Sequence, residues 1–155
     1  MPKNEYIFYI IVQFIGGRYI WSSYIYSYFP DDHDQFVNFK RGFYYTLNGI
    51  NNLATTNSRI EIRILLNSIT NKRIKQLSSF IFKNLPFINH VAFMGIEVIG
   101  NVTLNWNELR IDSMKYLNYI EESIDFLSRW NIRVSIYNIP LCNLPLKLYQ
   151  EIYQN

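Results

Sequence analysis

The stretch IEIRILLN, residues Ile60 to Asn67, sets the fold class of this chain. Its isoleucines alternate with Glu61, Arg63 and Leu65, and a period of two residues is typical of a β-strand. A parallel strand covered by helices on both faces is nearly continuous in apolar residues, whereas this strand has one charged face. Two explanations fit equally well. In the first, the strand lines a partly polar barrel that receives a ligand. In the second, the polar residues are structural: Glu61 and Arg63 form an internal network, or the strand lies at a sheet edge with one face exposed to solvent.

Further strands are expected on either side of this one, at Arg18–Ser27, His90–Met94 and Ile132–Tyr137. In the last of these, Arg133, Ser135 and Tyr137 repeat the polar face. Helix-like segments separate the strands, and strand–helix alternation predicts parallel strands joined by right-handed crossovers. We therefore expect an α/β fold with about four parallel strands, which is an open sheet or half of a barrel.

Apolar residues at spacings of three and four mark the helices. One stripe runs from Phe36 to Leu53, with Asp34 as the expected N-cap. A second helix should start at an Asn71 cap, and a third, capped by Asp112 or Ser113, should end at a left-handed Asn131. A short final helix is expected within Leu144–Tyr153.

Composition limits the class of protein. The chain has 155 residues, enough for one domain but short of the roughly 250 residues of a full (β/α)8 barrel. Its net charge of +3 is modest, and its densest basic cluster, Lys72, Arg73 and Lys75, falls on one helical turn, so we expect no nucleic-acid partner. The longest apolar run, Tyr6 to Ile15, is shorter than a membrane span. The single cysteine fits a reducing, cytoplasmic compartment.

Ligands of parallel α/β folds bind at the C-terminal ends of the strands. There His33 and Asp34 are a candidate acid/base pair, although Asp34 is also needed as a helix cap. His90, at the start of a strand, is expected to be structural. Three roles are open for Cys142: a nucleophile, a cluster ligand or a small buried residue. The glycines at 95 and 100 do not form a phosphate loop.

Several segments, taken in order, resemble the radical S-adenosylmethionine (SAM) maturases of the His-Xaa-Ser peptide system. The segments are Tyr26–Ser27, Pro30–Asp34, Gly42–Phe43, Thr46–Leu53, Glu61–Ile64, Asn84–Ile88, His90–Glu97 and Val134–Cys142. The resemblance covers roughly residues 18–155, the expected partial barrel domain. Residues 1–17 remain an unplaced segment and a possible edge strand.

The resemblance implies half of a radical SAM TIM-like barrel. In such enzymes a [4Fe–4S] cluster reduces SAM, and the resulting 5′-deoxyadenosyl radical takes hydrogen from a ribosomally made peptide. The resemblance also implies that Ser27 and Arg63 contact the ribose and carboxylate of SAM, and that Met94 and Gly95 pack near its adenine. Cys142 resembles the first ligand of an auxiliary cluster, but this chain would supply none of the other cysteine ligands.

The chain departs from the family because it lacks the CxxxCxxC loop and has one cysteine. We therefore expect a fragment of a radical SAM peptide maturase, inactive without a separate N-terminal half and binding no cofactor by itself. The alternative is a non-catalytic module that binds a peptide or a partner maturase, and a distant third is an unrelated ligand-binding protein. We also expect the edge at Arg18–Ser27 either to recruit a second copy or to be covered by Met1–Ile15.

Overall fold

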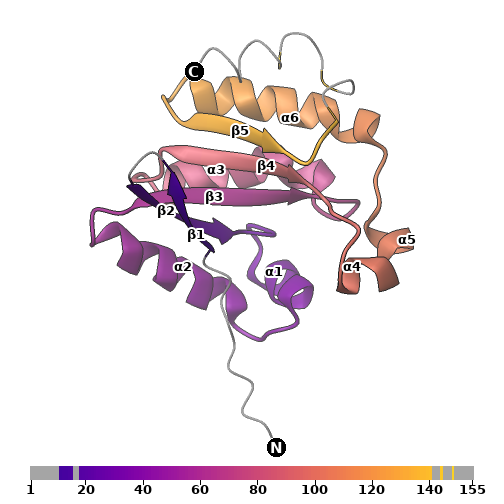
Figure 1. Cartoon of the computed structure of the whole chain (residues 1–155), viewed down its shortest axis with the longest axis horizontal. Helices are drawn as coiled ribbons and strands as arrows, with labels where there is room; N and C mark the ends of the chain where they lie inside the picture. Colours follow the sequence, from indigo (N-terminus) through magenta and orange to yellow (C-terminus); the bar gives the residue numbers. More distant parts are fainter. Residues whose placement is uncertain (1–10, 16–17, 141–143, 145–147, 149–155) are drawn as a thin grey trace, which may run out of the picture.

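A computed structural model describes residues 11–15, 18–140, 144 and 148, and these form one five-stranded sheet in the order β1-β2-β3-β4-β5 (Figure 1). Strands β2 to β5 are parallel to one another, and β1 is antiparallel to β2. The strands are β1 (Ile11–Ile15), β2 (Arg18–Tyr24), β3 (Arg59–Leu66), β4 (His90–Gly95) and β5 (Arg133–Tyr137). The expected α/β class and the three expected parallel pairings are confirmed, and the sheet is open.

Strand β1 lies in the segment that the sequence left unplaced. It pairs with β2 from Ile11 opposite Ser22 to Ile15 opposite Arg18. Of the two expected outcomes for the β2 edge, coverage by the chain's own N-terminal region is therefore the one observed. Strand β2 is an inner strand, because β1 and β3 flank it.

The hydrophobic core lies between one face of the sheet and three helices, with α3 and α6 behind the sheet in Figure 1. Ile60, Ile62 and Ile64 of β3 point to this face and are buried. The helices α2 (Gly42–Ala54), α3 (Ile74–Asn84) and α6 (Ser113–Ser128) supply the facing side chains, among them Ile50, Leu77 and Ile120. Each such aliphatic side chain contributes roughly 1.5–3 kcal/mol by its burial. The periodic apolar stripes of these helices thus pack on one face of the sheet.

The expected single helix from Phe36 to Leu53 is in fact two helices, so that prediction is wrong. Helix α1 (Pro30–Val37) ends at Asn38, which has a left-handed backbone with φ of 51°, and α2 starts after Arg41, with φ of 66°. Asparagine tolerates this conformation better than most residues. The break does not interrupt the apolar spacing, which explains why periodicity missed it.

Asp34 is not the N-cap of this region but lies inside α1. Its carboxylate instead accepts hydrogen bonds from the backbone N–H groups of Arg41 and Phe43, the latter at 2.8 Å. It therefore caps the start of α2 from the preceding helix. The expected cap by Asn71 is also wrong, because Asn71 starts the short helix η1 (Asn71–Arg73) and its side chain accepts from Lys72 N.

The remaining elements are short. Helices α4 (Asn101–Leu104) and α5 (Trp106–Leu109) lie between β4 and α6. Asn131 is left-handed, with φ of 57°, as predicted for the end of α6. The expected final helix lies almost wholly outside the described residues. Among those described, no helix has the length and apolar character needed to cross a membrane.

Candidate functional site

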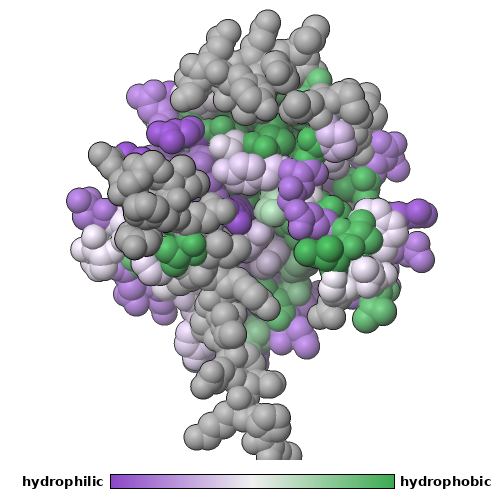
Figure 2. Space-filling view, in the orientation of Figure 1, coloured by the Kyte–Doolittle hydropathy of each residue, from purple (hydrophilic) through white to green (hydrophobic). Residues whose placement is uncertain are grey.

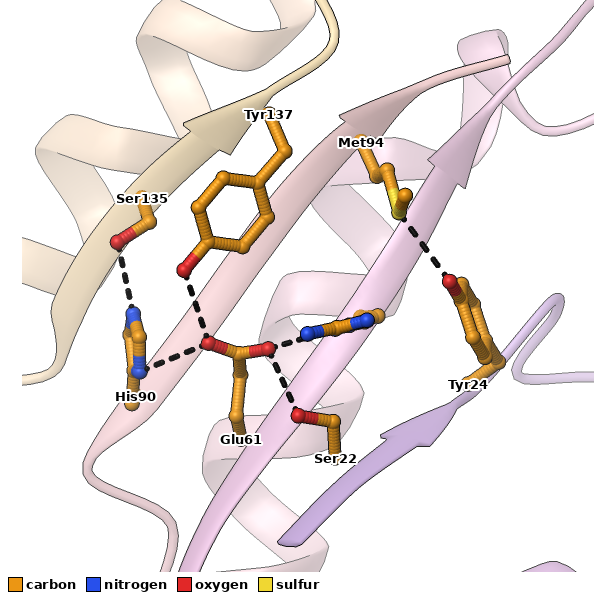
Figure 3. Close-up of polar contacts among 8 residues, drawn as sticks. Ser22, Tyr24, Glu61, His90, Met94, Ser135 and Tyr137 are labelled. Atoms are coloured by element: carbon orange, nitrogen blue, oxygen red, sulfur yellow. Dashed lines mark hydrogen bonds and ion pairs between the residues drawn. The ribbon is translucent and has the colours of Figure 1, made fainter. Parts of the chain in front are cut away.

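Polar side chains gather on the face of the sheet opposite the helices (Figure 3). Strand alternation brings them there: parallel register places Ser22 beside Glu61, and Glu61 beside His90. We call the set the Glu61 network, and its members are Ser22, Glu61, Arg63, His90, Ser135 and Tyr137. They come from β2, β3, β4 and β5, so the network ties together all four parallel strands.

Glu61 is the centre of the network because four donors surround its carboxylate. Arg63 Nε donates to Oε1 at 2.6 Å and Ser22 Oγ donates to the same oxygen at 3.0 Å. The Oε2 atom accepts from Tyr137 Oη and lies 3.2 Å from His90 Nδ1. The side chains of Arg63 and Glu61 are only 6% and 2% exposed. A buried ion pair with further hydrogen bonds of this kind offsets part of its desolvation cost.

Two tyrosines enclose the Arg63 guanidinium. Its central carbon lies 5.9 Å from the ring centre of Tyr24 and 5.7 Å from that of Tyr137, within the range of cation–π attraction. Burial lowers the pKa of Arg63, but the hydrogen bond to Glu61 and the contact with Tyr24 outweigh it, and the net shift is upward. Arg63 is thus held as a cation.

His90 connects the carboxylate to Ser135. Its Nδ1 faces Glu61, and its Nε2 lies 2.9 Å from Ser135 Oγ. Burial lowers the pKa of His90, Glu61 opposes the shift, and the positive charges of Arg133 and Arg63 reinforce it. The pKa of Tyr137 is raised by burial and by the charge on Glu61. At neutral pH the network therefore holds a neutral imidazole and a neutral phenol.

The residues expected to contact SAM have other partners within the chain. Tyr24 donates to Met94 Sδ at 3.2 Å, so Tyr24 bridges Met94 and Arg63. Gly95 is needed for a close approach, because a Cβ there would collide with the carbonyl oxygen of Asn138. SAM binding through Arg63 and Met94 stays a prediction.

Ser27 is buried beyond the C-terminal end of β2. Its Oγ accepts from Phe29 N at 3.1 Å and donates to Asp32 at 3.4 Å, and Asp32 pairs with Arg73. These side chains line a cavity of about 20 Å³, room for about one water molecule. Contact of Ser27 with the SAM ribose stays a prediction.

The side chains of the candidate pair His33 and Asp34 are hydrogen-bonded to other groups and not to each other in the contacts that the structure describes. His33 is buried, its Nδ1 accepts from Tyr26 N at 3.3 Å, and its Nε2 lies 3.5 Å from Thr46 Oγ1. Burial lowers the pKa of His33 to about 4, against the opposing charge of Asp34. Asp34 is occupied with the start of α2. Both residues shape the α1–α2 junction.

Cys142 lies outside the described residues. Within the described part of the chain, no group of three or more His, Cys, Asp and Glu side chains is arranged to hold a metal ion. The [4Fe–4S] ligand set of the resembled family is also missing from the sequence, which has one cysteine.

No protein-family model matches the chain, and no curated protein matches it. The function therefore has to be argued from the fold and from the Glu61 network.

Sequence reasoning missed the part of this network that runs from Glu61 through His90 to Ser135. It treated His90 as a structural residue at the start of a strand. The available signal was alternation: His90 shares its face with Glu61, and Ser135 lies on the same face two residues along β5 from Arg133, the partner of His90. The hydrogen bonds themselves depend on the register between strands.

Proposed function

We propose that this chain is a partial barrel of the radical SAM type that binds a peptide or a partner maturase, and that it does not cleave SAM by itself. The observation that carries this proposal is the buried Glu61–Arg63 pair on the face opposite α2, α3 and α6, in an open sheet whose strands β2 to β5 are parallel. In a barrel, helices cover the outside and the other face of each strand points inward. Polar residues on that face agree with the interior of a barrel completed by another polypeptide.

An exposed apolar surface near the C-terminal end of β4 supports a binding role. Val98, Ile99 and Leu104 are 51%, 65% and 84% exposed, and green atoms gather over α4 in Figure 2. Contiguous exposed apolar side chains of this kind are common at contacts with other proteins. A partner or peptide at the C-terminal ends of the strands would bury them.

The lack of SAM cleavage by the chain itself follows from ligand count. A [4Fe–4S] cluster generally needs three or four thiolates, and the sequence offers Cys142. Anaerobic reconstitution with iron and sulfide is therefore expected to leave the purified chain without the absorption of such a cluster. A sample holding about four irons per chain would contradict this.

Co-expression tests the binding role. The partner is a polypeptide carrying the first three strands of a radical SAM barrel with its CxxxCxxC loop. Because β1 covers the edge of β2, this partner has to displace β1 to pair with β2, and we expect it to co-purify with this chain in equal amounts. The same polypeptide with its cysteines changed to serine is the matched control, which separates strand pairing from cluster assembly. Failure of both forms to bind would overturn the proposal.

The second candidate, a split but active maturase, predicts a further result in the same experiment. The complex with an intact CxxxCxxC loop would cleave SAM to 5′-deoxyadenosine, and the serine form would not. Binding without cleavage supports the non-catalytic module. The internal partners of Arg63 and Met94 favour that outcome.

A further inference from the structure

Ser135, His90 and Glu61 contact one another in this order across β5, β4 and β3 (Figure 3). Ser135 Oγ lies 2.9 Å from His90 Nε2, and His90 Nδ1 lies 3.2 Å from Glu61 Oε2. The imidazole therefore touches the hydroxyl with one nitrogen and the carboxylate with the other. This is the order of groups that activates a serine nucleophile, and it is recognised by geometry and not by position in the chain.

The surroundings fix the proton positions. A carboxylate accepts hydrogen bonds and does not donate them, so Nδ1 of His90 carries the proton. In the neutral ring, Nε2 is then a free acceptor for the Ser135 hydroxyl. Tyr137 and Arg63 also donate to Glu61, which holds the carboxylate in place while it orients the imidazole.

The charged and titratable groups around His90 keep it a base. The charges acting on it are those of Glu61 and Arg63 from β3 and of Arg133 from β5, and Tyr137 of β5 donates to the same Glu61 oxygen that faces His90. Burial and the two arginines lower the pKa of His90 against the pull of Glu61. Around pH 7 the imidazole is therefore unprotonated and able to take a proton.

We propose that Ser135 is a nucleophile which His90 activates and Glu61 positions, and that it accepts the acyl group of a small carboxylic ester. Ser135 Oγ attacks the carbonyl carbon, its proton passes to His90 Nε2, and the bond to the leaving alcohol breaks as that proton is returned. Water then attacks the acyl-serine with the same base, giving the acid and free Ser135. This activity is independent of the partner binding proposed above.

The neighbours of Ser135 limit the substrate. Ala92 faces it across the β4–β5 ladder, and Ser135 itself is half-buried, so a short acyl chain fits better than a bulky one. Arg133 is exposed, two residues away on the same face of β5. It offers a positive charge to an acyl chain that ends in a carboxylate.

The test uses the full chain and a fluorophosphonate, which forms a Ser–O–P bond with loss of fluoride when a serine is activated. Digestion and mass spectrometry should find the label on Ser135. Changing His90→Ala should slow labelling about 100-fold, the lower end of general-base contributions. Ser128→Ala, at an exposed serine of α6, is the control that should change nothing.

The pH profile separates catalysis from structure and does not need a destabilised variant. Labelling should fall at low pH as His90 becomes protonated, and Arg133→Gln should move this limb to higher pH because it removes a nearby positive charge. With p-nitrophenyl acetate, the chain should release about one equivalent of nitrophenolate rapidly, and Ser135→Ala should abolish that burst. Labelling elsewhere, or labelling of Ser135 at the rate of an exposed serine with no pH limb, would overturn the proposal.

Discussion

At the scale of single residues, the polar face of the sheet depends on the carboxylate of Glu61. It receives hydrogen bonds from β2, β3 and β5 and contacts His90 of β4. Removing one partner of a buried ion pair costs more than removing both, because one buried charge is left uncompensated. The network is therefore testable by comparing single and double substitutions.

We expect Glu61→Leu to lower the free energy of unfolding by about 3–5 kcal/mol. The double variant Glu61→Leu/Arg63→Met should lose less than half of that, because no cation then remains without its carboxylate. Urea denaturation measures both. The matched control is Glu122→Leu, whose partner Lys75 is 61% exposed, so it should change stability by less than about 1 kcal/mol. Equal losses for Glu61→Leu and Glu122→Leu would contradict the network.

His33 makes stability depend on pH. Its folded-state pKa of about 4 lies below the ordinary value of 6.5, so between these values the unfolded chain binds a proton that the folded chain does not. The contribution of His33 to the free energy of unfolding is therefore fully present above pH 6.5. It falls as the pH is lowered, by about 1.4 kcal/mol for each pH unit down to pH 4. Denaturation curves at pH 7, 6 and 5 should show this, and His33→Gln should give a flatter profile. A slope unchanged by that substitution would refute the assignment.

At the scale of elements, the junction between α1 and α2 shows where sequence reasoning failed. The apolar stripe from Phe36 to Leu53 continues in phase across the break, so periodicity indicated one helix. The break depends on left-handed backbone at Asn38 and Arg41 and on a carboxylate that reaches forward to Arg41 and Phe43. The spacing of apolar residues along the sequence contains no information on such contacts.

Asp34 should therefore matter to the start of α2. We expect Asp34→Ala to lower the free energy of unfolding by about 0.5–2 kcal/mol, the range for loss of a helix cap. Gln35→Ala, at the exposed neighbouring position, should cost little. Thermal denaturation followed by circular dichroism distinguishes the two, and equal melting temperatures would show that Asp34 does not cap α2.

Strands were easier to predict than helix boundaries. The alternation in Ile60–Asn67 gave the polar and apolar faces of β3, and the spacing of the other strands gave a parallel order. Only part of the candidate site could be predicted from the sequence. Glu61 and Arg63 are two residues apart on one strand, so their pairing could be predicted from the sequence spacing. His90 and Ser135 are 45 positions apart, and their contact depends on the register between β4 and β5.

At the scale of the whole molecule, β1 determines which edge the sheet exposes. It covers β2 along five register pairs. A chain lacking Met1–Ile15 would leave the backbone donors and acceptors of β2 open, and such an edge recruits another strand. We expect the truncated chain to self-associate more strongly than the intact chain in sedimentation velocity at micromolar concentration. A truncated chain that stays monomeric would contradict this edge argument.

The measurement that tests the Glu61 network most directly is the tautomer of each of the two histidines in the chain. His90 points Nδ1 at a carboxylate, and His33 accepts a backbone N–H on Nδ1. At pH 7, a long-range ¹H–¹⁵N spectrum should therefore show His90 protonated on Nδ1 and His33 protonated on Nε2, both neutral. Finding His90 protonated on Nε2, or as the imidazolium, would contradict the account.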